Sequence, residues 1–181
     1  MSDRLAYHGA AVSHSDALAK DILNNDPEIK RQLCEHFGDD VFDKAGILQN
    51  RTLADRAFSH REGQRFLNHL IHPEVKKHTM IRVDEAREKG HTLFVVDAPL
   101  LFEAHADSLT DQVLVITAKR IFREGRVERR SQITQVDFER REALQMPIEE
   151  KIRRADYVID NDGSLEELLE KVDSFYQGLK L

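Results

Sequence analysis

Four apolar runs interrupt a chain that otherwise carries the spacing of helices. Three are rich in valine and isoleucine, at residues 91–97, 112–118 and 156–161, and a weaker one includes Ala11 and Val12. Continuous apolar runs of this length are typical of strands buried on both faces, as in a parallel sheet covered by helices. Because helical patterns separate the runs, the sequence predicts βαβ units and an α/β fold.

Helical spacing dominates residues 17–89, where apolar side chains recur every three or four positions, as do Ile29, Leu33 and Phe37. We expect one of these helices to end before Pro73 and the last of them to end at Gly90. A stretch of about seventy residues is far longer than one crossover between strands requires. The sequence therefore predicts a helical insertion within residues 17–90 and a second helical excursion over residues 119–154.

The composition is that of a single globular domain. The chain has 181 residues, of which 40% are apolar and 33% are charged, enough for a sizeable core. No run approaches the roughly 20 apolar residues of a membrane span, and the first residues lack the basic-then-apolar order of a signal peptide. A net charge of −6 argues against non-specific nucleic-acid binding by the whole surface. These features predict a cytoplasmic protein without a membrane or nucleic-acid partner.

Cysteine and histidine positions do not predict a metal site. The single cysteine, Cys34, excludes an internal disulfide and a cysteine-based metal cage, and its apolar helical surroundings favour a buried structural thiol. His69 and His72 lie three residues apart on an expected helix, but no acidic residue accompanies them at the spacing of metal ligands. No metal-ligating residue is therefore assigned from spacing.

Two acidic residues are expected at the carboxyl edge of the sheet, where ligands bind in open α/β folds. Asp97 ends the run 91–97, and Asp16 follows the first run and begins a helix. Asp97 there can hold Mg²⁺ directly or through water, or it can simply cap the next turn. Asp16 can accept a proton from a substrate hydroxyl, or it can be an ordinary helix N-cap. The residues alone leave both alternatives open.

An arginine-dense segment follows the run 112–118. Arg126 and Arg130 are four residues apart and share a helix face, and Gln145 lies one turn beyond Arg141. Clustered guanidinium groups suit a polyphosphate, because each can donate to two phosphate oxygens at once. The alternative is a solvated helix face whose arginines pair with Glu124, Glu128, Glu139 and Glu142.

Taken together, these motifs resemble the dephospho-coenzyme A kinase family over nearly the whole chain. The stretch V-S-H-S-D at 12–16 resembles the family's V-I-D-A-D, and D-A-P-L-L-F-E at 97–103 matches D-x-P-L-L-x-E. The R-x3-R pattern of 126–130 and the R-x3-Q-M pattern of 141–146 resemble those of the family's lid. Residues 155–164 match its ending, A-D-x-V-I-D-N-x-G-S, almost residue for residue.

The resemblance implies a P-loop kinase fold, a three-layer α/β architecture with a five-stranded parallel core. It implies a helical coenzyme-binding region at 17–90 and a mobile, arginine-rich helical lid at 119–154. The activity it implies is transfer of the γ-phosphoryl group of ATP to the 3′-hydroxyl of dephospho-coenzyme A, the last step of coenzyme A synthesis. ATP and Mg²⁺ are the expected cofactors, and the oligomeric state is left open.

The resemblance also implies roles for individual residues. Asp16 would be the general base, and Arg141 would act with the lid arginines to neutralise phosphate charge. The turn around Asn161 would approach the adenine of ATP. The expected substrate- or phosphate-binding residues are Asp97, Leu100, Arg126, Arg130 and Gln145.

The chain departs from the family at two positions and in one motif. His14 replaces the first acid of the strand-turn, and Ser131 replaces an acid that commonly follows the lid arginine. The family begins with a strand and the phosphate loop G-x-x-G-x-G-K-S/T, whereas Met1 falls just past the place of that loop. The expected missing piece of roughly 15–20 residues includes the central strand, which would lie between the strands at 92–97 and 112–117.

Three interpretations follow from the missing loop. We favour a kinase whose N-terminus is lacking from this chain, so that these residues alone are inactive. The second is a non-catalytic relative that binds a coenzyme A-like ligand or a protein partner. The third, a basic segment that serves nucleic acid, fits poorly with the negative net charge and the few interleaved aromatic residues.

Overall fold

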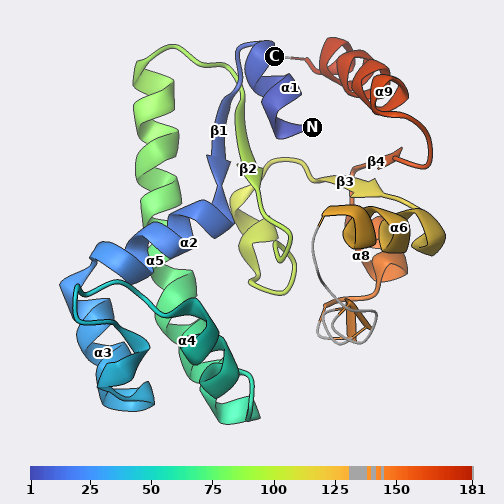
Figure 1. The fold of residues 1–181 in the computed structure, drawn as a ribbon. Coiled ribbons are helices and arrows are strands. Elements are labelled where there is room, and N and C mark those ends of the chain that lie inside the picture. The colour runs from blue at the N-terminus through green and yellow to red at the C-terminus, as the bar shows by residue number, and fades with distance from the viewer. Residues whose placement is uncertain (131–137, 140–141, 144, 181) are drawn as a thin grey trace. The chain divides into compact units, whose positions relative to one another are not determined.

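The computed structural model describes residues 1–130, 138–139, 142–143 and 145–180, and of residues 128–130 the backbone alone. Figure 1 traces the chain and labels its elements. The chain divides into two compact units, one formed by residues 11–98 and the other by residues 1–10 together with 99–181.

The unit of residues 11–98 combines a two-stranded parallel sheet with helices. Its sheet pairs β1 with β2, so that Ala11 lies opposite Phe94 and His14 lies opposite Asp97. The long helix α5 contacts both strands and α2 contacts β1 (Figure 1). Its elements are β1 (Ala11–His14), α2 (Ser15–Asn25), α3 (Pro27–Phe37), the 3₁₀ helix η1 (Asp39–Val41), α4 (Asn50–Ala57), α5 (Arg61–Glu88) and β2 (Phe94–Asp97).

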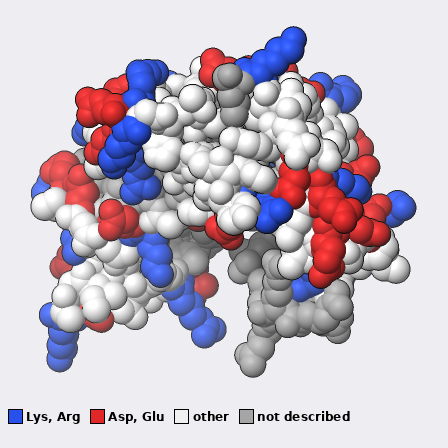
Figure 2. Space-filling model, turned by 90° about the horizontal axis from the view of Figure 1, so that it is seen from above, with Lys and Arg blue, Asp and Glu red and all other residues white. Residues whose placement is uncertain are grey.

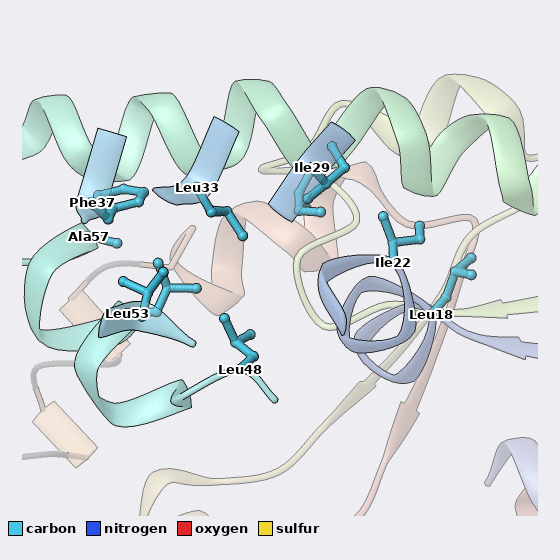
Figure 3. Close-up of a cluster of buried hydrophobic side chains, with 10 residues drawn as sticks. Leu18, Ile22, Ile29, Leu33, Phe37, Leu48, Leu53 and Ala57 are labelled. Atoms are coloured by element: carbon cyan, nitrogen blue, oxygen red, sulfur yellow. The ribbon is translucent and has the colours of Figure 1, made fainter. Parts of the chain in front are cut away.

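The helix α3 shows how the sequence pattern becomes a packed element. Asp26 caps its N-terminus, accepting hydrogen bonds from the backbone N–H groups of Glu28 and Ile29 at 2.9 and 3.0 Å. Ile29, Leu33 and Phe37 recur every four residues and are all buried, as the spacing predicted. They join side chains of α2, α4 and α5 in one apolar core; Figure 3 labels Leu18, Ile22, Ile29, Leu33, Phe37, Leu48, Leu53 and Ala57 of this cluster.

The expected helix end before Pro73 is wrong. Helix α5 continues from Arg61 to Glu88 with Pro73 inside it. A proline in a helix interior removes one backbone hydrogen bond and crowds the preceding turn, at a cost of about 3 kcal/mol. Ile71 before the proline and Val75 after it belong to the same apolar core, so packing on both sides offsets that cost.

The second unit also contains a parallel pair of strands. β3 pairs with β4, with Leu114 opposite Tyr157 and Thr117 opposite Asp160. Helix α8 contacts β3, α9 contacts β4, and α1 contacts α9. The elements of this unit are α1 (Ser2–Tyr7), the 3₁₀ helix η2 (Ala106–Leu109), β3 (Leu114–Thr117), α6 (Arg120–Arg130), α8 (Ile148–Arg154), β4 (Tyr157–Asp160) and α9 (Leu165–Gly178).

The predicted α/β class with parallel strands is confirmed, but the strands are less buried than their apolar runs indicated. In β4, Ile159 is buried while Tyr157 and Val158 are exposed. Every strand has only one partner strand among the described residues. Within that same part of the chain, no helix is both long and apolar enough to cross a membrane.

A polar cluster holds the short helix α1 against α9. The guanidinium of Arg4 donates two hydrogen bonds of 2.6 Å to Asp173, and Nε2 of His8 lies 2.7 Å from the same carboxylate. The His8 ring stacks on Tyr176 with 4.6 Å between centroids, and the Tyr176 hydroxyl donates to the His8 carbonyl at 2.9 Å. A six-residue helix is unstable alone, so these contacts keep α1 folded.

We predict that Asp173→Asn lowers the melting temperature at neutral pH. The hydrogen bonds from Arg4 hold the pKa of the Asp173 carboxyl well below its usual range. A depressed folded-state pKa contributes stability above the unfolded value of about 3.9, and this contribution is lost as the pH falls further. The difference in melting temperature between the two proteins, followed by circular dichroism, therefore narrows steadily from about pH 4 to about pH 2.

Asp84→Asn is the matched control, because Asp84 pairs at 2.9 Å with Arg87 on an exposed face of α5. Exposed pairs of this kind contribute about 0–1 kcal/mol, so little change is expected. An Asp173→Asn protein as stable as the wild type at pH 7 would contradict the role given to this carboxylate.

Candidate nucleotide and substrate site

The carboxyl ends of β1 and β2 bring His14 and Asp97 together. The parallel register places the two residues opposite each other, and Nδ1 of His14 lies 3.2 Å from Oδ2 of Asp97. Their side chains are 49% and 39% exposed. The strand-turn and the acid after the second apolar run therefore meet at the edge where the sequence placed them. The histidine that departs from the family pattern is itself in contact with this acid.

Asp16 lies in the first turn of α2, directly after this edge. The N-cap of α2 is His14, so the structure does not support the alternative of Asp16 as N-cap. The Asp16 side chain is exposed, and no hydrogen bond links it to another described residue. A carboxylate near a helix N-terminus is favoured by the helix dipole. Asp16 thus presents an accessible carboxylate, which suits the proton-accepting role expected of it.

The loop after β2 is anchored by Glu103, which the sequence analysis did not assign to a site. Its Oε1 accepts hydrogen bonds from the Met146 backbone N–H and from Nζ of Lys151, both at 2.8 Å. Lys151 also donates to the carbonyl of Pro99 at 3.0 Å. This anchor fixes the segment that follows Gln145 onto the loop that carries Leu100; both of those expected substrate-binding residues are exposed.

Glu103 and Lys151 form a shielded ion pair, with side chains 20% and 12% exposed. Burial raises the pKa of Glu103, but hydrogen bonds from Lys151 and the Met146 N–H more than offset this, and the pKa is lowered overall. Glu103 is therefore ionised at neutral pH. Its second oxygen, Oε2, is buried without a hydrogen-bond partner among the described residues. Because this oxygen has no such partner, loss of the Lys151 cation would leave the shielded carboxylate poorly compensated.

Arg126, expected to bind phosphate, donates hydrogen bonds to two backbone carbonyls. Its Nη1 donates to the Asn161 carbonyl at 2.6 Å and its Nη2 to the Gly163 carbonyl at 3.1 Å. These carbonyls belong to the turn between β4 and α9, the turn expected near adenine. The side chain of Arg130 and the whole of Arg141 lie outside the described residues, so their expected roles stay predictions.

Other arginines of α6 follow the alternative interpretation of a helix face paired with glutamates. Arg120 donates to Glu124 at 2.6 Å, and Arg123 lies 2.7 Å from Glu142. The arginines of α6 therefore make two kinds of contact in the structure. Arg120 and Arg123 pair with carboxylates, whereas Arg126 reaches the turn.

Lys119 and Lys171 also hold this turn, and the sequence analysis did not predict either contact. Asp162 accepts a hydrogen bond from the Lys119 backbone N–H at 2.8 Å, and Nζ of Lys119 lies 3.2 Å from its other oxygen. The bond from the Lys119 N–H is the main cause of a lowered pKa of Asp162. Lys171 of α9 donates to the Asp160 carbonyl at 2.7 Å. The run D-N-D-G signalled a turn, but nothing in it indicated these partners.

Charge at the surface is mixed. On the face drawn in Figure 2, acidic and basic side chains lie beside one another in several places, acidic ones gather in one larger group, and the basic ones form no continuous surface. The part of the chain that the structure describes contains no group of three or more His, Cys, Asp or Glu able to hold a metal ion. Asp97 still offers a carboxylate of the kind that Mg²⁺ takes when substrate phosphates and water complete its shell.

The candidate site residues thus fall into two groups. His14, Asp16 and Asp97 lie at one sheet edge in the unit of residues 11–98, whereas Arg126 and Asn161 lie together in the other unit. The first group offers carboxylates for proton and cation chemistry. The second offers a backbone turn that three cationic side chains hold in place.

Known proteins resemble this chain over almost its whole length. The family model described as dephospho-CoA kinase matches residues 1–167. The dephospho-CoA kinase of Listeria monocytogenes serotype 4b is 31% identical over 175 residues, which cover 97% of this chain and 88% of that protein. That of Corynebacterium jeikeium is 34% identical over 179 residues, with 99% and 92% covered. A crystal structure of a Thermus thermophilus protein matches with a TM-score of 0.80 and 31% identity, covering 99% of this chain and 90% of that one.

The Glu103–Lys151 pair yields a stability prediction. Lys151→Met leaves the shielded carboxylate without its cation and should lower the free energy of unfolding by about 1–3 kcal/mol. Glu103→Gln keeps an acceptor for the Met146 N–H and should cost less. Urea denaturation measures both, and the double variant should recover part of the loss caused by Lys151→Met.

Lys77→Met is the matched control, since it breaks a pair with Glu74 at 3.1 Å in which the lysine is exposed and the glutamate only partly shielded. Its effect should lie within about 1 kcal/mol. If Lys151→Met is no less stable than Lys77→Met, the pair does not anchor the loop.

Proposed function

The chain belongs to the dephospho-CoA kinase family, and we propose that its fold serves transfer of the γ-phosphoryl group of ATP to the 3′-hydroxyl of dephospho-CoA. The observation that carries this proposal is the sheet edge where Asp97 lies against His14 and α2 presents Asp16. A carboxylate at the carboxyl end of a parallel strand is where α/β proteins bind their ligands. An exposed second carboxylate one turn away suits a base that acts on a hydroxyl.

Asp16 accepts the proton of the 3′-hydroxyl as that oxygen attacks the γ-phosphorus, while the bond from this phosphorus to the β–γ bridging oxygen breaks and ADP leaves. Its carboxylate is exposed at the start of α2, so a sugar hydroxyl can reach it from solvent. His14 holds one oxygen of Asp97 and thereby orients that carboxylate. When bound, Mg²⁺ would be held by Asp97 and would neutralise charge on the phosphates.

The remaining expected residues complete the substrate site in this proposal. Arg130 and Arg141 donate to phosphate oxygens, and Leu100 and Gln145 contact the acceptor substrate. The turn at Asn161 approaches the adenine of ATP. Phosphoryl transfer depends almost entirely on positioning and electrostatic stabilisation, so each of these contacts would be felt in the rate.

The 181 residues contain no G-x-x-x-x-G-K-S/T sequence, the loop whose backbone N–H groups and lysine bind phosphates in P-loop kinases. We propose that a strand and phosphate loop joined ahead of Met1 complete the site. Each described strand has only one partner strand, so backbone N–H and C=O groups on its other edge can pair with an added strand. These 181 residues alone would then transfer phosphate very slowly.

The proposal is tested by comparing the 181-residue chain with the same chain preceded by the strand and phosphate loop of a relative. With ATP and dephospho-CoA, the extended protein should form the 3′-phosphorylated product. The shorter chain should be slower by at least about a hundredfold, since loss of even one positioned donor costs about 10²–10³-fold. Equal rates would contradict the need for the loop. Binding of dephospho-CoA without transfer by the extended protein would favour the non-catalytic interpretation.

The role of Asp16 is tested in the extended protein. Asp16→Asn should lower kcat by about 10²–10⁴-fold, the usual contribution of a general base, with little change in the KM for ATP. Asp21→Asn is the matched control, because Asp21 lies on the same helix and contacts only Asn25 in the hydrogen bonds observed. An Asp16→Asn enzyme with unchanged kcat would remove Asp16 from the mechanism.

A further inference from the structure

We propose that Arg126 is a positioning residue, which holds the turn between β4 and α9 in place for the base of a nucleotide and does not itself bind phosphate. This inference rests on the proposed function, since it takes ATP to be the ligand whose base meets the turn. It differs from the role expected for Arg126 from the sequence. The reason lies in where its guanidinium is already engaged.

The outer edge of the Arg126 guanidinium is occupied. Nη1 and Nη2, the two nitrogens that would fork onto a phosphate, donate to two different carbonyls, at Asn161 and Gly163. The shorter of these bonds, 2.6 Å to Asn161, is partly buried. The N–H groups that Nη1 and Nη2 donate to these carbonyls cannot donate to a phosphate at the same time, so a phosphate would have to share the guanidinium with the turn or displace it. A guanidinium that satisfies carbonyls in this way works as a brace for the backbone.

The turn is held at successive positions, and Arg126 supplies the contact that reaches across it. The Asn161 N–H donates to the Thr117 carbonyl at 2.7 Å, which continues the pairing of β4 with β3. Lys119 holds the side chain of Asp162 at the next position. Arg126 alone among the described residues bonds to carbonyls on both sides of Asp162. Loss of Arg126 would allow the backbone of the turn to move, while β4 stays paired with β3 and α9 stays folded.

Among the described residues, the side chain of Asn161 is one polar group of the braced turn that a ligand can use. The side-chain amide of Asn161 forms no hydrogen bond with a described residue. An amide offers a donor and an acceptor together, which matches the amine and ring nitrogen on the edge of adenine. Arg126 holds the Asn161 carbonyl and so stabilises the backbone position that carries this amide. The ligand class assigned to the turn is therefore an adenine base, and Arg126 acts through the turn's backbone.

The N-terminus of α9 is capped without Arg126, which separates the role of Arg126 in the turn from a general structural role. Ser164 caps α9 in a reciprocal pair with Glu167, and a Cβ at Gly163 would lie 1.6 Å from the Glu167 carboxylate. The cap uses the Ser164 side chain and the Glu167 backbone, and neither contacts Arg126. Replacement of Arg126 should therefore loosen the turn without unfolding α9.

The test uses the 181-residue chain and its Arg126→Lys and Arg126→Gln variants. Arg120→Lys is the matched control, because Arg120 lies on the same helix and pairs with Glu124. Hydrogen–deuterium exchange of peptides spanning residues 158–165 is measured without ligand. Dissociation constants are then measured for two separate probes, adenosine, which has no phosphate, and inorganic tripolyphosphate, which has no base.

We expect both Arg126 variants to exchange faster in 158–165 and to bind adenosine about 5–30-fold more weakly, the effect of losing one or two hydrogen bonds. Tripolyphosphate binding and the melting temperature should stay close to those of the wild type, and Arg120→Lys should match the wild type throughout. A purely structural arginine would lower the melting temperature instead and would not separate the two probes.

Two outcomes overturn the inference. One is a loss of tripolyphosphate binding with unchanged exchange and adenosine affinity, which would make Arg126 a phosphate ligand. The other is a wild-type chain that does not bind adenosine. Failure of the proposed function would be seen separately, as absence of phosphoryl transfer by the extended protein with Arg126 intact.

Discussion

The parallel pairing of β1 with β2 is the constraint on which the carboxylate edge depends. It sets His14 opposite Asp97, residues more than eighty positions apart in the chain. Since side chains alternate across a strand, a slip of one residue would turn Asp97 to the opposite face. The register is stabilised from one side by α5, which contacts both strands and whose Arg82 donates to the buried Ser13 at 3.3 Å. The long helical segment between β1 and β2 therefore also stabilises their pairing.

In the other unit, ionised side chains hold the loops in position, as strand pairing holds His14 and Asp97 in position at the sheet edge. Glu103 and Lys151 anchor the chain after Gln145, and Arg126 and Lys119 anchor its start at the β4–α9 turn. Most of these contacts end on backbone groups, so they determine the path of loops more than they add net stability. The arginine-rich segment 119–147 is thus tied at both ends by charge. Of its expected phosphate ligands, Arg130 and Arg141 lie between these two anchors in the sequence.

The sequence predicted the parts of this structure that follow from local pattern. Valine- and isoleucine-rich runs located β2, β3 and β4, and the spacing of Ile29, Leu33 and Phe37 located α3. The break at Pro73 was wrong because packing on both sides of a proline overrides its local preference. The partners of Arg126 were beyond sequence reasoning, since spacing shows which face of a helix an arginine occupies but not which acceptor it meets. Asp16 and Asp97 were placed correctly at the sheet edge, while their chemistry stays a prediction.

The most direct measurement is ³¹P NMR of the chain extended by a strand and phosphate loop, incubated with ATP and dephospho-CoA. The carboxylate edge is proposed to direct the γ-phosphoryl group to a sugar hydroxyl. A new phosphomonoester resonance should therefore grow at the rate at which the γ-phosphate resonance of ATP is lost. Loss of ATP to ADP and inorganic phosphate without a phosphomonoester would contradict the proposed function of this edge.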